Sequence, residues 1–123
     1  MIKIHTTSYL RGLWAEIYAM LALFFRGYRI LAWRYKTPVG EVDIVAIRRN
    51  ILVFVEVKLR PDLDQGYAAV TPRSQQRITR AANHFIASHH KFQGVSFRFD
   101  VMAVAGWRSE EHTSELQSRS AIS

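Results

Sequence analysis

Two apolar runs separated by a short polar segment constrain the fold of this chain more than any other feature. Residues 40–60 read GEVDIVAIRRNILVFVEVKLR, in which Val42–Ile47 and Ile51–Leu59 flank Arg48-Arg49-Asn50. Runs of this length, rich in β-branched residues and joined by a polar turn, predict an antiparallel strand hairpin. A hairpin this apolar must pack against another part of the chain.

The turn determines which residues of the two strands face each other. When the turn is centred on Arg49-Asn50, Val45 faces Phe54 and Asp43 faces Glu56. Alternate side chains of a strand share a face, so one face of the hairpin should be wholly apolar. Its residues would be Val42, Ile44, Ala46, Val53, Val55 and Val57. The other face is apolar near the turn and charged at the far end.

The predicted register brings two carboxylates together among apolar residues. Like charges facing each other across strands are destabilising, by up to about 1 kcal/mol on an exposed sheet and by more where water is excluded. A divalent cation would neutralise both Asp43 and Glu56, and Mg²⁺ characteristically binds one or two carboxylates together with waters and phosphates. The alternative is an ordinary edge hairpin in which Lys58 pairs with one carboxylate. A register slip of one residue would separate the carboxylates but would mix the two faces.

The remaining segments predict two helices, two further strands and a loop. Helical spacing of apolar residues predicts a helix over Thr6–Arg26, and Thr71-Pro72 is typical of the start of a second helix. Tyr28–Tyr35 and Phe97–Ala105 alternate as strands do, whereas Arg60–Val70 has the composition of a mobile loop. The predicted fold class is α/β, with a mixed β-sheet flanked by helices in the order α-β-β-β-α-β.

The first helix is nearly all apolar over Leu13–Phe25. A signal peptide is one interpretation, but Glu16 interrupts the run and no small-residue cleavage site follows before Arg26. The run is also shorter than the roughly 20 residues of a membrane-spanning helix. We expect a buried helix, whose core-facing stripe would be Leu13, Ile17, Met20, Leu21 and Phe24. The absence of cysteine fits a reducing compartment, so we expect a cytoplasmic protein without a membrane partner.

The chain is strongly basic, with a formal net charge of +7 and a pI of about 10.3. This charge favours a polyanionic partner, with nucleic acid ahead of an acidic membrane surface. The second helix offers candidate phosphate contacts, although a solvated helix face is the alternative; they are Arg73, Arg77, Arg80 and Gln75. We expect Glu41 and Asp100 to pair with basic side chains rather than to bind metal.

The last sixteen residues, RSEEHTSELQSRSAIS, are polar and have neither helical nor strand periodicity. Arg108–Ser118 resembles the in-frame translation of a common sequencing-adapter oligonucleotide, with Arg119–Ala121 from index bases and Ile122-Ser123 from the constant sequence that follows. We therefore expect residues 108–123 to be an artefactual, unstructured tail, and residues 1–107 to form a single domain. The alternative is a natural polar tail. Sequencing the gene past codon 107 tests this.

An ordered set of motifs resembles known protein families. Gly40-Glu41-Val42-Asp43 followed by Val53–Lys58 resembles the Asp…Glu-x-Lys signature of the restriction-endonuclease-like, PD-(D/E)xK, superfamily. More closely, nearly all of residues 8–107 resembles the YraN-like family of small bacterial proteins. The further elements of that likeness are Glu16, Gly27–Ile30 and Phe97–Val101.

The resemblance implies an endonuclease-like core and a nuclease, dependent on Mg²⁺ or Mn²⁺, that acts on DNA, branched or damaged DNA included. It implies metal binding by Asp43, Glu56, the Val57 carbonyl and Glu16 from the first helix. Lys58 would orient the attacking water or stabilise the transition state, so the implied catalytic residues are Asp43, Glu56, Lys58 and Glu16. The alternatives are a non-catalytic nucleic-acid-binding module on the same fold and a protein-interaction subunit. DNA versus RNA and the oligomeric state, a dimer included, stay open.

Overall fold

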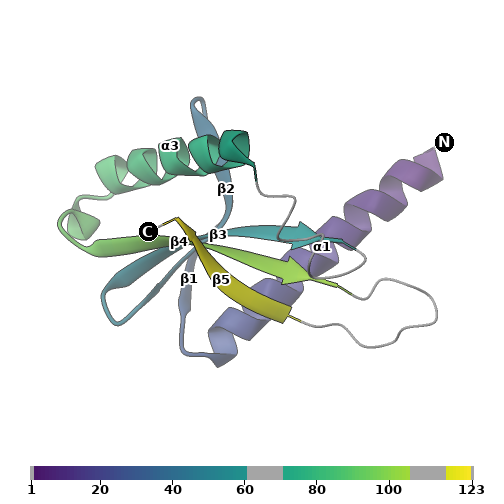
Figure 1. Cartoon of the computed structure of the whole chain (residues 1–123), viewed down its shortest axis with the longest axis horizontal. Helices are drawn as coiled ribbons and strands as arrows, with labels where there is room; N and C mark the ends of the chain where they lie inside the picture. The colour runs from purple at the N-terminus through teal and green to yellow at the C-terminus, as the bar shows by residue number, and fades with distance from the viewer. Residues whose placement is uncertain (1, 61–70, 106–115, 123) are drawn as a thin grey trace.

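The computed structural model describes residues 2–60, 71–105 and 116–122, and there it has two α-helices on opposite sides of a five-stranded sheet (Figure 1). The elements in chain order are α1 (Ile2–Phe25), β1 (Arg29–Thr37), β2 (Gly40–Arg48), β3 (Ile51–Leu59), α3 (Pro72–Ser88), the 3₁₀ helix η1 (His90–Phe92), β4 (Ser96–Val104) and β5 (Leu116–Ile122). The strands lie in the order β1-β2-β3-β4-β5, and only β3 and β4 are parallel neighbours. The predicted mixed α/β fold and the order α-β-β-β-α-β are confirmed. Residues 61–70 of the predicted loop lie outside the described residues.

Local signals in the sequence determine where these elements begin and end. Arg49 and Asn50 both have positive φ, 52° and 65°, which are the angles of the type I′ turn that suits a two-residue hairpin. Gly27, at φ +93°, ends α1 in the left-handed conformation that glycine adopts without strain. Thr71 caps α3, because its side chain accepts a hydrogen bond of 3.1 Å from the Ser74 N–H, and a proline follows at the first helical position.

Each face of the sheet is covered by one helix. The core on the α3 side consists of Val42, Val45, Leu52, Phe54, Ile78, Ala81, Ala82, Phe85, Phe92 and Phe99. The core on the α1 side consists of Ala19, Leu23, Ile44, Ala46, Val53, Val55 and Met102. The hairpin strands β2 and β3 contribute to both cores. Burial on two faces explains why their sequences are almost continuously apolar instead of alternating.

Helix α1 contacts the sheet through small residues. Ala15, Ala19 and Leu23, four residues apart, are at most 4% exposed. The predicted stripe is therefore wrong in part, since Leu21 and Phe24 are 51% and 62% exposed. Alanines let the helix lie close to the sheet, whereas large side chains define an apolar stripe most visibly in a sequence. No helix of the described residues is long and apolar enough to cross a membrane.

The structure corrects the expectation that the C-terminal segment is wholly unstructured. Residues 116–122 form β5, which pairs antiparallel with β4 from Val104↔Leu116 to Phe99↔Ile122. The physical reason is that β4 would otherwise present an edge of unpaired N–H and C=O groups, and such an edge pairs readily with any extended segment. Residues 106–115 and 123 lie outside the described residues. The likeness of this segment to a translated adapter stays a prediction.

Candidate metal and nuclease site

The β2–β3 hairpin has the predicted register near its turn and opens at its other end. Its paired residues run from Arg48↔Ile51 to Ile44↔Val55, as predicted. Asp43 and Glu56 lie beyond the last pair of this ladder. There the Asp43 side chain replaces a backbone acceptor, because its Oδ2 accepts a hydrogen bond of 2.8 Å from the Val57 N–H. We call this end of the hairpin, with Asp43, Glu56 and Lys58, the acid end.

The opening also changes which face Val42 occupies. We expected Val42 to share a face with Ile44, but Val42 lies in the α3-side core with Val45, whereas Ile44 lies in the α1-side core. Strict alternation along β2 is therefore broken at Asp43, which separates Val42 from Ile44. The irregularity is what brings a charged side chain between two strands that are otherwise buried.

Asp43 lies in an environment that disfavours its charge. Burial, and then the negative charge of Glu56, raise the pKa of Asp43 from 3.8 to about 7. The Val57 N–H and the Lys58 ammonium act in the opposite direction but do not compensate. A second cation near Asp43 would therefore stabilise its ionised form.

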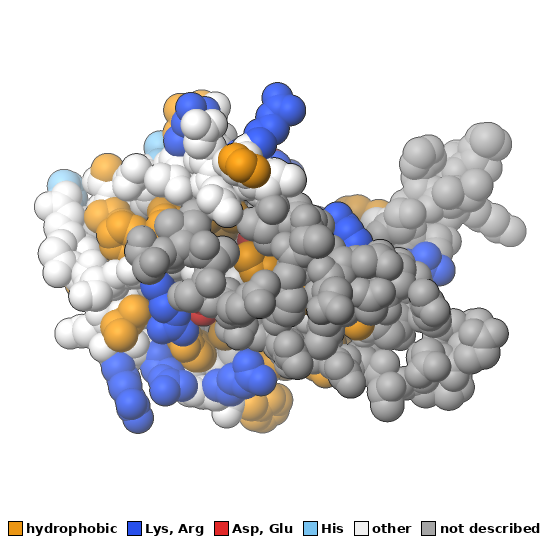
Figure 2. Space-filling model, in the orientation of Figure 1, with side chains coloured by type: hydrophobic (Ala, Val, Ile, Leu, Met, Phe, Trp, Pro, Cys, Tyr) orange, Lys and Arg blue, Asp and Glu red, His pale blue; other side chains and the backbone are white. Residues whose placement is uncertain are grey.

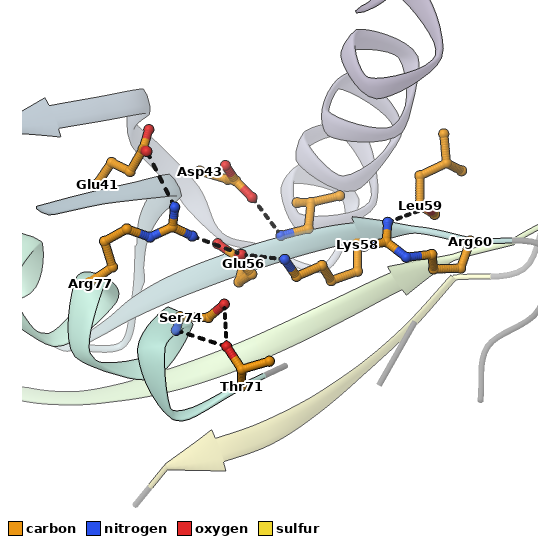
Figure 3. A network of polar contacts seen from close by, with 10 residues as sticks. Glu41, Asp43, Glu56, Lys58, Leu59, Arg60, Thr71, Ser74 and Arg77 are labelled. Carbon is orange, nitrogen blue, oxygen red and sulfur yellow. Dashed lines mark hydrogen bonds and ion pairs between the residues drawn. The ribbon is translucent and has the colours of Figure 1, made fainter. Parts of the chain in front are cut away.

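Glu56 is only 4% exposed, and two basic side chains lie beside it (Figure 3). Lys58 Nζ is 2.9 Å from Glu56 Oε2, and Arg77 Nη2 is 3.7 Å from the same oxygen. The ion pair of Lys58 with one of the two carboxylates, which the alternative interpretation of the hairpin requires, is therefore present. A buried carboxylate needs such partners, because an isolated buried charge is strongly destabilising.

Arg77 reaches the acid end from α3, although the sequence assigned it only to a phosphate-binding helix face. Its Nη1 lies 3.4 Å from Glu41 Oε2, so the prediction that Glu41 pairs with a nearby arginine is confirmed. Its Nε is buried and has no hydrogen-bond partner among the described residues. The close approach of α3 to β2 depends on Gly40, because a Cβ at this position would be 2.2 Å from the Arg77 carbonyl oxygen.

Glu16 is held by two neighbouring residues of β1, a contact that the sequence did not predict. Trp33 Nε1 and Arg34 Nε donate hydrogen bonds of 2.7 Å and 2.8 Å to the same oxygen, Oε1. Neighbouring strand residues normally point to opposite faces, but Arg34 has a φ of +56° that breaks this alternation. No sequence signal marks an arginine for the left-handed conformation. The charge of Glu16 also contributes to the raised pKa of Asp43.

A pocket of about 260 Å³ lies where α1 crosses the end of β3. Glu16 and Lys58 both line it, together with Gly12, Ala15, Val57, Leu59 and Arg60. The pocket therefore gives two of the predicted site residues a common space that solvent can enter. Within residues 2–60, 71–105 and 116–122, no three acidic or histidine side chains are gathered closely enough to hold a metal ion as they stand.

The other predicted contacts lie away from this pocket. Arg73 and Arg80 are exposed on α3, and Gln75 is half-buried in its first turn. Asp100 is 5% exposed and pairs with Arg98 at 3.1 Å, so the expected pairing of this carboxylate with a basic side chain is confirmed. Contact of the α3 side chains with nucleic acid stays a prediction.

Comparison with known sequences places the acid end inside a shared region. A family model described as "Uncharacterised protein family UPF0102" matches residues 15–104. A UPF0102 protein of Bradyrhizobium diazoefficiens is 53% identical over 94 residues, which cover 76% of this chain and 71% of the relative. A UPF0102 protein of Nitrobacter winogradskyi is 50% identical over 101 residues, covering 82% of this chain and 86% of the relative. The matched region includes Glu16, Asp43, Glu56 and Lys58.

Proposed function

We propose that this chain, which belongs to the uncharacterised protein family UPF0102, is a metal-dependent nuclease that hydrolyses phosphodiester bonds in DNA. The observation that carries the proposal is Asp43, a carboxylate buried beside Glu56 whose negative charge the Val57 N–H and Lys58 do not compensate. The pKa of Asp43 is raised to about 7 by burial and by Glu56, so the site would gain from a divalent cation.

The donor set fits Mg²⁺ or Mn²⁺. These are hard cations that take oxygen ligands, and Mg²⁺ needs only one or two carboxylates from a protein when waters and substrate phosphates complete its shell. Asp43 and Glu56 would hold it, with the Val57 carbonyl and Glu16 as further donors. The chemistry that such a cation supplies is neutralisation of charge at the phosphate and activation of water near neutral pH.

Lys58 and Arg77 supply the positive charges of the site that come from the protein itself. Lys58 lines the pocket and lies 2.9 Å from Glu56, so its ammonium is placed to orient a water or to stabilise negative charge on the phosphate. Arg77, which pairs with Glu41 and Glu56, brings a second positive charge to the opposite side of Glu56. Strand-borne groups with fixed partners give the rigid placement that catalysis requires.

The direct test is cleavage of labelled single-stranded, duplex and branched DNA with Mg²⁺ or Mn²⁺. We expect cleavage by the wild-type chain and none by Asp43→Ala or Lys58→Ala. Glu41→Gln, which removes a half-exposed carboxylate from the same region, is the matched control and should remain active. Calorimetric titration of Mn²⁺ should show binding to the wild type and not to Asp43→Ala. Cleavage that survives in Asp43→Ala, or no cleavage of any substrate, would contradict the proposal.

A non-catalytic nucleic-acid-binding module is a second candidate, favoured by one observation. Lys58 and Arg77 already lie against Glu56, so this buried carboxylate is neutralised without a metal. Such a module would bind DNA equally well or more tightly when Asp43→Ala removes a negative charge. Binding that is independent of divalent ions, without cleavage, would identify it.

A further inference from the structure

Arginines gather at the end of the molecule opposite the acid end. Helix α1 ends there, the β2–β3 turn lies there, and β4 begins there. In Figure 2, Lys and Arg side chains cluster at the lower left, over the region where Figure 1 places the end of α1. We call this the turn-end surface; its residues are Arg26, Tyr28, Arg29, Arg48, Arg49 and Arg98.

Two of these arginines converge on one tyrosine. The guanidinium of Arg48 lies 5.1 Å from the centroid of the Tyr28 ring, and that of Arg98 lies 6.0 Å away. Arg98 also donates a hydrogen bond of 2.7 Å to the Tyr28 hydroxyl, and Arg48 donates one of 2.8 Å to the Arg26 carbonyl. These contacts hold positive charges close together in fixed positions.

Among the residues that the structure describes, no exposed carboxylate is paired with the turn-end surface. Asp100, which pairs with Arg98, is only 5% exposed. Arg26, Arg29 and Arg49 are exposed, and none has a carboxylate within ion-pair distance among the described residues. Clustered like charges raise the free energy of the folded chain unless an anion binds between them.

Exposed aromatic rings adjoin these arginines. Phe24 and Phe25, at the end of α1, are 62% and 80% exposed, and their rings meet edge to face at 5.5 Å. Surfaces that bind single-stranded nucleic acid combine positive charge along the backbone with aromatic rings on which unpaired bases stack. The arginines come from strand ends and turns, and Arg26 directly follows Phe25 in the chain. They do not form the polar face of a helix that lies flat on a membrane.

We propose that the turn-end surface binds a single-stranded segment of nucleic acid, with Arg26, Arg29 and Arg49 on phosphates and Phe24 and Phe25 against bases. The proposal extends the proposed nuclease function, because it names the substrate class and the surface that holds it. Arg48 lies five residues along β2 from Asp43, about 16 Å at the rise of a strand. A single strand of nucleic acid that contacts both ends must therefore span about 16 Å.

The test compares two variants of equal charge change, with binding of labelled oligothymidine of about 20 nucleotides measured by anisotropy in EDTA. The first is Arg29→Gln combined with Arg49→Asn, because asparagine tolerates the left-handed conformation of that turn residue. The matched control is Lys36→Gln with Lys91→Gln, at two exposed lysines that belong neither to the turn-end surface nor to the predicted contacts of α3. Loss of two single-strand phosphate contacts should lower the salt-dependence slope by about 1.4, which is about 25-fold in affinity at roughly 0.1 M salt. The control should change affinity less than about threefold.

Equal losses in the two double variants, or no loss in the first, would overturn the proposal. Phe24→Ala with Phe25→Ala should weaken single-strand binding and leave duplex binding unchanged. Equal effects on single strands and duplexes would contradict the stacking role. Binding to vesicles with and without anionic lipid is measured in parallel. Vesicle binding that depends on Arg29 and Arg49, without any DNA binding, would overturn the proposal and assign the surface to a membrane. All binding is measured in EDTA, without metal. The binding results therefore test this surface even if the chain shows no nuclease activity.

Discussion

Replacing Asp43 by asparagine should stabilise the metal-free protein, and the gain should depend on pH. Asparagine has nearly the same shape, and its side-chain oxygen can still accept the hydrogen bond from the Val57 N–H. What it removes is the charge that burial and Glu56 disfavour. The substitution therefore separates the cost of the carboxylate from the geometry around it.

The pKa gives the sign and the bound of the effect. The folded-state pKa of Asp43, about 7, is above its ordinary value of 3.8, so the folded chain holds this proton more tightly than the unfolded chain does. Below about pH 3.8 the group is protonated in both states and contributes nothing. As the pH rises towards 7 the unfolded state loses its proton first and stability falls, by at most about 4 kcal/mol at about 1.4 kcal/mol per unit. Because buried sites relax and admit water, we expect a gain for Asp43→Asn of about 1–3 kcal/mol above pH 7.

Urea denaturation of both chains in EDTA, at about pH 4 and about pH 8, measures this gain as a difference in which other titrating groups cancel. Glu41→Gln, at a half-exposed carboxylate paired with Arg77, is the control and should show no such pH-dependent gain. Addition of Mn²⁺ should stabilise the wild type and not Asp43→Asn, since a ligand stabilises only the state that binds it. A gain for Asp43→Asn of equal size at both pH values, or a loss at about pH 8, would refute the reasoning.

Three further substitutions test other parts of the structure. Gly40→Ala should lower the free energy of unfolding in urea by about 3 kcal/mol, since its Cβ would meet the backbone of α3. Gly12→Ala is the control, because its Cβ meets nothing within 4 Å, and it should be neutral or stabilising by up to about 1 kcal/mol. Similar values for the two variants would contradict the packing of Gly40 against α3. Thr71→Ala should lower the free energy of unfolding by about 1 kcal/mol, because it removes the side-chain cap of α3. Thermal unfolding measures this loss, and Thr71→Ser, which keeps a capping hydroxyl, is the control. Arg34→Ala should lower the free energy of unfolding by about 1–3 kcal/mol, because it removes the ion pair with Glu16. Arg34→Gly should lower it by about 1 kcal/mol less, because glycine adopts the positive φ of this position without strain. A larger loss for Arg34→Gly than for Arg34→Ala would show that the backbone is not strained there.

Sequence reasoning succeeded where the determinants are local. The register of the hairpin follows from a two-residue turn at Arg49-Asn50, and the start of α3 follows from Thr71, so each was readable from a few neighbouring residues. Membership of the UPF0102 family, implied by the likeness to YraN-like proteins, is confirmed. The expected pairing of Asp100 with an arginine is also confirmed.

Sequence reasoning failed where long-range packing decides. Periodicity could not show that α1 packs through Ala15 and Ala19 instead of its larger side chains. Alternation could not place Val42, because the opening of the ladder at Asp43 depends on a side-chain hydrogen bond to the neighbouring strand. The contact of Trp33 and Arg34 with Glu16 requires Arg34 to adopt the left-handed backbone conformation. The strain of that conformation is offset by tertiary contacts, which are not readable from neighbouring residues.

The left-handed conformation of Arg34 also affects how β1 can meet another chain. As the first strand in the sheet order, β1 has one side without a neighbouring strand among the described residues. Such a side is a template for intermolecular pairing unless irregular backbone or charge prevents it. Here the pairing with β2 shifts between Ile30 and Ala32, Arg34 breaks the pleat, and Lys36 is exposed. The residue that holds Glu16 in place thus also protects an open sheet edge against aggregation.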